Sequence, residues 1–71
     1  MNQRIEQIRR LERAERYIAV DRERISRQRD NVIQFEREGV DHRSARHFLS
    51  SLLEIQAAHE NWRKAIIDEI E

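Results

Sequence analysis

The feature that most limits the fold of this 71-residue chain is its single glycine, Gly39, together with the absence of proline. Glycine and proline are the residues that most readily interrupt a helix. On both sides of Gly39, apolar residues recur every three to four positions, the spacing of a helix with one buried face. The pattern predicts an all-α fold: an antiparallel two-helix hairpin in one domain over residues 1–71, with helices at 3–38 and 42–69 and a turn at 39–41.

The first helix carries a heptad pattern with two polar interruptions, Asp21 and Gln28. Seven-residue spacing is close to the period of a left-handed supercoil, so the two helices should wrap gently around each other. The inward positions are Leu11, Ala14, Ile18, Asp21, Ile25, Gln28, Val32 and Phe35. On the exposed side, glutamates precede arginines by four residues, an order that supports a helix: Glu6–Arg10, Glu12–Arg16 and Glu23–Arg27.

The ends of both helices have residues suited to capping them. Asn2 is expected to cap the first helix, and Gly39 suits the left-handed position that follows its last turn. Asp41 is expected to cap the second helix, because its carboxylate can accept from backbone N–H groups of the next turn.

The second helix is apolar over an arc that is wider than one partner helix can cover. Two adjoining stripes are expected to face the first helix: Phe48, Ile55 and Trp62, and Ala45, Leu52, His59 and Ile66. A third stripe of small side chains should let another helix approach closely: Ser44, Ser51, Ala58 and Ala65. The other flank carries Leu49, Leu53, Ile67 and Ile70.

Closure at Gly39 should place residues opposite each other when their numbers add up to about eighty. Phe48 then faces Val32, Ile55 faces Ile25, and the polar residue His59 faces Asp21. We expect Asp21 and His59 to hydrogen-bond in a polar core layer. Such a layer can fix helix register and oligomeric state, which is the favoured interpretation, or respond to pH through the histidine.

The surplus apolar surface predicts association of two hairpins into a four-helix bundle. A chain this short supports only a marginal core alone, so a partner chain is the expected supplement. Residues 17–20 are apolar on nearly the whole circumference of the first helix, and the second helix carries the stripe of small residues. Both features are suited to contact with another hairpin. The expected partner is a second copy, or otherwise another protein, and the expected dimer contacts are Tyr17, Val20, Ser51, Ala58, Trp62 and Ala65.

Composition argues against catalysis and ligand chemistry. Cysteine is absent, which removes disulfides, thiolate metal sites and cysteine nucleophiles. His59-Glu60 begins a metalloprotease-like motif, but Arg63 stands where the second histidine ligand is required. One glycine cannot form a phosphate-binding loop. We expect no enzyme activity, metal, cofactor or small-molecule substrate, and the lack of a signal or membrane-spanning run favours a cytoplasmic protein.

The arginines of the first helix suggest an alternative function, the binding of nucleic acid. The net charge is zero, with 14 basic and 14 acidic residues, so bulk charge attracts no particular partner. The first helix is nevertheless rich in arginine, which binds phosphates through paired hydrogen bonds. Acidic residues interleave with these arginines and no aromatic platform accompanies them, so nucleic acid is the less favoured partner. Its candidate contacts are Arg9, Arg13, Arg16, Arg24 and Arg27.

One resemblance covers about residues 14–63. The blocks Glu15–Ala19, Ile25–Arg29 and Phe35–Gly39 with Asp41, followed by Leu52, Gln56, His59 and Arg63, resemble those of short uncharacterised helical-hairpin proteins of alphaproteobacteria. This resemblance implies a small bacterial all-helical protein and carries over no catalytic residue. The sequence as a whole favours a structural or protein-interaction module that forms a homo-oligomeric helical bundle.

Overall fold

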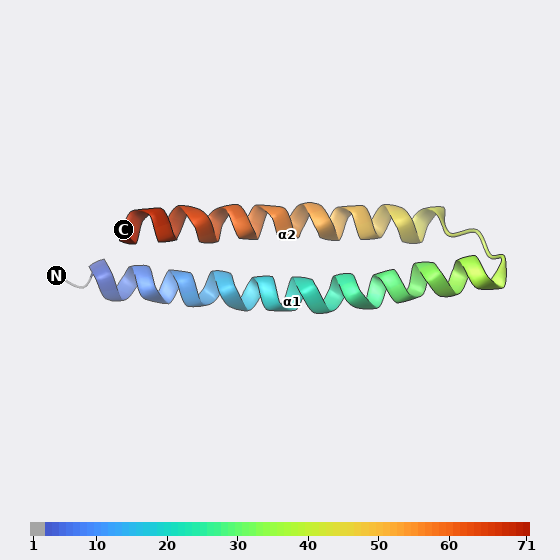
Figure 1. The fold of residues 1–71 in the computed structure, drawn as a ribbon, viewed down its shortest axis with the longest axis horizontal. Coiled ribbons are helices and arrows are strands. Elements are labelled where there is room, and N and C mark those ends of the chain that lie inside the picture. Colours follow the sequence, from blue (N-terminus) through green and yellow to red (C-terminus); the bar gives the residue numbers. More distant parts are fainter. Residues whose placement is uncertain (1–2) are drawn as a thin grey trace.

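The chain forms an antiparallel helical hairpin in a computed structural model that describes residues 3–71. Helix α1 spans Gln3–Glu38 and helix α2 spans Arg43–Ile70, and they lie side by side with the start of α1 and the end of α2 at the same end of the molecule (Figure 1). The hairpin is slender, with extents of 59 × 14 × 14 Å between Cα atoms. The predicted all-α hairpin is confirmed; the expected cap residue Asn2 lies outside the described residues.

Gly39 ends α1 through a Schellman motif. The N–H of Gly39 donates to the carbonyl of Glu36 at 3.3 Å, and the N–H of Val40 donates to the carbonyl of Phe35 at 3.0 Å. These two bonds satisfy carbonyls that the last turn would otherwise leave unpaired. Gly39 has φ +70°, a left-handed conformation in which a Cβ atom is strained. The sequence-based expectation for Gly39 is confirmed.

Replacing Gly39 with alanine should destabilise the hairpin by about 1–2 kcal/mol, because alanine is strained in the left-handed region. A Cβ atom at this position meets no atom within 4 Å, so the effect should be conformational and not steric. Gly39→Asn should cost less, since asparagine tolerates this conformation best among the other residues. Urea unfolding followed by circular dichroism measures both variants, and equal losses for both would contradict this explanation.

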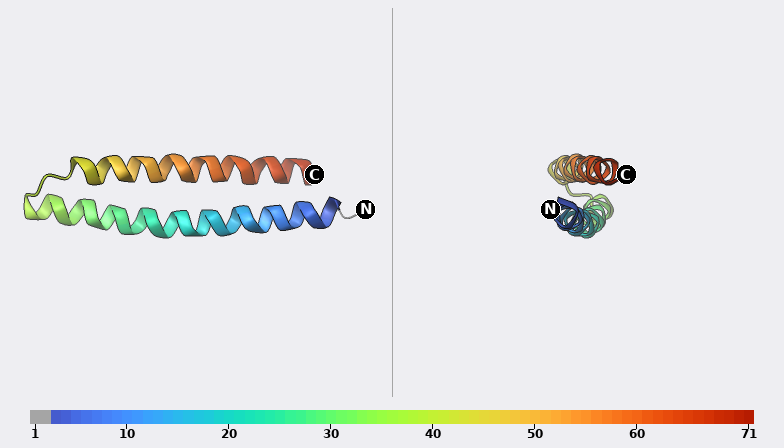
Figure 2. Two further views of the ribbon diagram at one scale, coloured as in Figure 1. Left: turned by 180° about the vertical axis from the view of Figure 1, so that it is seen from behind. Right: turned by 90° about the vertical axis from the view of Figure 1, so that its left-hand side faces the viewer.

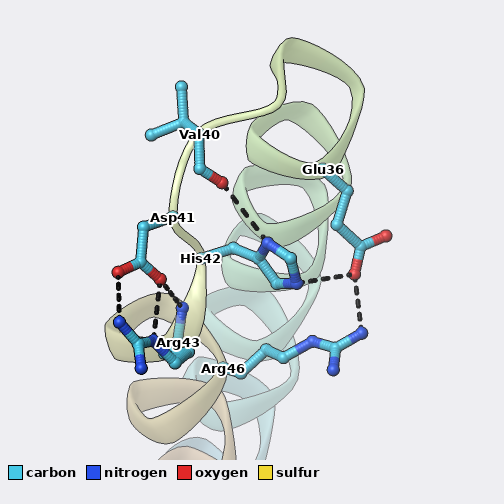
Figure 3. Close-up of polar contacts among 6 residues, drawn as sticks. All are labelled: Glu36, Val40, Asp41, His42, Arg43 and Arg46. Atoms are coloured by element: carbon cyan, nitrogen blue, oxygen red, sulfur yellow. Dashed lines mark hydrogen bonds and ion pairs between the residues drawn. The ribbon is translucent and has the colours of Figure 1, made fainter.

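The start of α2 differs from the expectation in one position. The helix begins at Arg43 and its cap residue is His42, which makes no side-chain capping bond. Asp41 lies one residue earlier, and its Oδ1 accepts from the backbone N–H of Arg43 at 3.1 Å (Figure 3). The pKa of Asp41 is lowered, mainly by hydrogen bonds from the Arg43 side chain and to a smaller extent by the bond from the Arg43 N–H. Asp41 therefore closes the turn instead of occupying the predicted cap position.

A second group of side chains ties the turn end of the hairpin together. The Nη2 atom of Arg46 donates to Oε1 of Glu36 at 2.8 Å, which links α2 back to α1. His42 lies between the two helices, with Nε2 at 3.7 Å from the same Glu36 oxygen and Nδ1 at 3.3 Å from the carbonyl of Val40 (Figure 3). These exposed contacts hold the two ends of the turn together but add little to overall stability.

The register of the two helices is the one that the sequence predicts. His59 pairs with Asp21 near the middle of the hairpin, and Glu69 pairs with Arg10 near its open end. Both pairs, like Glu36 with Arg46 near the turn, have residue numbers that add up to about eighty. The core between the helices consists of Ala14, Ile18, Ile25, Val32, Leu52 and Ile66, with Asp21 and Gln28 as buried polar members.

The predicted facing of α2 is wrong for Phe48 and Ile55. Their exposed fractions are 54% and 44%, so neither fills a layer against Val32 or Ile25. The residues that turn toward α1 instead include Leu49 and Gln56, which are half-buried and lie one position further along the helix. The reason is that α2 is rotated to place Leu52, Ile66 and the polar residue His59 against α1, and this rotation turns the Phe48 stripe toward solvent.

Candidate interaction surface

The polar layer at the centre of the hairpin brings together Asp21 from α1 and His59 from α2. The Nδ1 atom of His59 lies 2.6 Å from Oδ2 of Asp21, and only 5% of Asp21 is exposed. On the surface side of this pair, the ring of Tyr17 stacks on His59 with centroids 5.2 Å apart and lies 6.1 Å from the ring of Trp62. The Tyr17 ring covers one face of His59, and Asp21 is buried, so the hydrogen bond between Asp21 and His59 lies in a partly buried environment, where it is stronger than in water.

Gln28 forms a second polar layer that the sequence marks only as an interruption of the heptad. Its Nε2 donates to the backbone carbonyl of Ala45 at 2.9 Å, and its Oε1 accepts from Nδ2 of Asn31 at 3.1 Å. No buried side-chain nitrogen or oxygen within residues 3–71 is left without a partner. A bond to a backbone carbonyl has no residue-type signature, which is why pairing of Gln28 could not be foreseen.

Large apolar side chains gather on one side of the hairpin, which we call the apolar face: Tyr17, Val20, Phe48, Ile55 and Trp62. Tyr17 and Val20 are 50% and 44% exposed, and Trp62 is half-buried. The described residues, 3–71, form α1 and α2 with no third element to pack on them, so nothing within this part of the chain covers this side (Figure 2). A shallow hollow beside Phe48 continues this face, lined by Arg24, Arg27, Gln28, Asn31, Phe48, Leu52 and Ile55.

Small side chains separate the large ones along α2. Each of three small residues, Ser51, Ala58 and Ala65, follows a large one, Phe48, Ile55 or Trp62, by three residues. Residues three apart share a side of a helix, so the small and large residues lie next to each other. Ser51 is half-buried, and Ala58 and Ala65 are exposed. All the residues expected as dimer contacts thus lie on or beside the apolar face, and Phe48 and Ile55 are members of it that the sequence assigned to the core.

The candidate phosphate contacts share one stripe of α1, next to the apolar face. Residues 9, 13, 16, 24 and 27 follow the three- and four-residue spacing of a single helix side, and all are exposed. Arg27 pairs with Glu23 as expected, whereas Arg13 pairs with Glu6 at 3.9 Å. The expected pair Glu6–Arg10 is wrong, since Arg10 donates to Glu69 of α2 at 3.1 Å. Two arginines of the stripe are thus engaged by acids of their own helix.

Two properties of the described part of the chain bear on ligands and membranes. Among residues 3–71, no cluster of three or more histidine, cysteine, aspartate or glutamate side chains is arranged to hold a metal ion. Neither helix combines the length and the apolar character that crossing a bilayer requires.

Comparison with known proteins adds no family to this picture. No family model, curated protein or solved structure gives a significant match to the chain.

Proposed function

We propose that this protein is a non-enzymatic, self-associating interaction module whose apolar face binds a second copy to form a four-helix bundle in the cytoplasm. The observation that carries the proposal is the distribution of apolar side chains. Within residues 3–71, six apolar residues are buried, whereas ten large apolar residues are exposed. Four of these ten, Tyr17, Val20, Phe48 and Ile55, belong to the apolar face. Singly exposed apolar residues are common on monomers, but a contiguous exposed group marks a protein contact.

The dimensions of the hairpin suit this proposal. The hairpin is 59 Å long between Cα atoms, which allows two copies to pack side by side along their helices, as in a four-helix bundle. Aromatic residues such as Tyr17 and Trp62 are enriched at the centre of such interfaces. Association would also supply the apolar burial that two helices cannot provide for each other, since small domains are stabilised mainly by added buried area.

The experiment is the mass in solution, measured by light scattering over a range of protein concentrations. The wild-type chain should be a dimer, and Ile55→Asp should make it monomeric, because the charge would be buried in the interface. Ile33→Asp is the matched control: Ile33 is 45% exposed, like Ile55, but belongs to the opposite side of the hairpin. A wild-type monomer at high concentration, or equal effects of both substitutions, would disprove the proposal.

Nucleic-acid binding is the second candidate, and the common stripe of Arg9, Arg13, Arg16, Arg24 and Arg27 is the observation that favours it. Its test is retention on heparin, which should weaken steeply with salt if these arginines contact phosphates. The apolar face beside the stripe is better explained by a protein partner, because phosphate contacts do not require exposed Phe48 or Ile55.

A further inference from the structure

We infer that two copies associate through their α2 helices, which cross antiparallel, so that the turns of the two hairpins point to opposite ends of the dimer. This inference rests on the proposed self-association and specifies its geometry. It follows from three properties of α2: the alternation of large and small residues, the position of the middle of the helix, and the charges at its ends.

Large and small side chains alternate along the exposed stripe of α2. The order is Ser44, Phe48, Ser51, Ile55, Ala58, Trp62 and Ala65. Two such stripes pack closely only when each large residue of one helix meets a small residue of the other, since facing large residues would leave gaps beside them. The stripe is therefore suited to pairing with itself in one particular register.

An antiparallel pair about a two-fold axis between Gln56 and Ala57 provides that register. Ile55 of one copy then faces Ala58 of the second, Phe48 faces Ala65, and Trp62 faces Ser51. The axis also coincides with the middle of Arg43–Ile70, so the two α2 helices overlap along their full length. Because the axis relates the copies, each of these contacts occurs twice.

The alternative arrangement, with both turns at the same end, places α2 against α1 of the second copy. In that arrangement, residues at the same level along the hairpin axis come into contact. Phe48 of one copy would face Asn31 of the second, and Ile55 would face Arg24. Asn31 and Arg24 already line the hollow beside these two residues within one copy. Covering the polar side chains with apolar ones would remove their water without providing hydrogen bonds, which is unfavourable.

The ends of α2 support the antiparallel pair. Its first turn contains no acidic residue and its last turn no basic one, the reverse of what the helix dipole favours. In the antiparallel pair, Asp68 and Glu69 of each copy come close to the first turn of α2 in the other copy. There the first-turn N–H groups, to which His42 gives no side-chain capping bond, attract the acidic side chain of Asp68. Arg43 and Glu69 already pair with Asp41 and Arg10 of their own copy, so they add little to this contact.

A swap of residue sizes tests the register. Ile55→Ala and Ala58→Ile should each weaken the dimer by about tenfold or more, because each spoils a contact that the two-fold axis repeats. The double variant exchanges large and small residues that face each other, so its dissociation constant, measured by analytical ultracentrifugation, should return to near the wild-type value. Ala57→Ile is the matched control on the outer side of α2 and should leave the dimer unchanged.

Distances between spin labels test whether the two hairpins run in opposite directions in the dimer. The chain has no cysteine, so Val40→Cys provides a single labelling site at the turn. The distance between the two labels should be close to the 59 Å length of the hairpin. A distance of roughly 20 Å, two helix spacings, would show turns at the same end. A dimer with that distance, or without recovery in the double variant, overturns this inference alone, whereas a monomeric wild type overturns the proposed function as well.

Discussion

Replacing Ile66 with alanine is expected to lower the free energy of unfolding by about 2–5 kcal/mol, the range for truncating a buried isoleucine. Ile66 has no exposed surface, and neither does Ala14, the residue at the same height on α1. Because the facing residue is already alanine, nothing large is available to fill the space that the truncation would leave. Small domains have total stabilities of only several kcal/mol, so most of the molecules should unfold at room temperature in mild urea.

The matched control is Ile70→Ala, one turn further along α2, where the side chain is 37% exposed. Its loss should be below about 1 kcal/mol, since little apolar area leaves the core. Both variants should be unfolded at several protein concentrations, because the proposed dimer would add a concentration-dependent contribution to stability. Equal losses for Ile66→Ala and Ile70→Ala would show that the core does not lie where the structure places it.

Asp21→Leu is expected to have the second-largest effect, a loss of about 1–3 kcal/mol, because it removes the partner of His59 in the polar layer. The loss should lie near the lower end, since 29% of the His59 side chain is exposed and its ring can turn toward water. Replacing both Asp21 and His59 with leucine should recover most of the stability, because a well-packed apolar pair commonly matches a buried polar one. Thermal melting followed by circular dichroism measures all three variants.

The same variants separate the two roles that the sequence suggests for this layer. If the layer fixes register, the double leucine variant should be stable but form a mixture of assembly states in light scattering. Asp30→Leu, an exposed acid on the same helix, is the control and should change neither quantity. If Asp21→Leu leaves both the melting temperature and the assembly state unchanged, the layer has no special role.

The fold could be predicted because its determinants are local. Gly39 marks the end of α1, and the left-handed conformation and the Schellman bonds found there follow from the lack of a side chain. The register then follows from where the chain turns, so the contact of Asp21 with His59 could be deduced without coordinates. Two polar residues in otherwise apolar stripes meet because leaving either alone in the core would be unfavourable.

The facing of α2 could not be predicted in the same way. Its apolar arc is wide enough for two heptad stripes that differ by one residue, and Phe48 with Ile55 looks more apolar than Leu49 with Gln56. Gln56 is tolerated toward α1 because a single pair of helices leaves the edges of its interface open to water. Periodicity finds the apolar arc of α2 but not which part of it faces α1, because the arc is wider than the surface that α1 covers.

The position of the best-buried layer has a consequence for the motions of the hairpin. Ala14 lies in the first half of α1 and Ile66 near the end of α2, so both are toward the open end, far from Gly39, where an isolated hairpin would fray most easily. If the helices pair from the turn outward, this layer is the last fully buried one to form, yet each doubling of the enclosed loop adds only about 0.6 kcal/mol of closure entropy. Fraying of the open end therefore first breaks the Arg10–Glu69 pair and then meets the fully buried Ala14–Ile66 layer, which should stop the fraying there and keep both helices together.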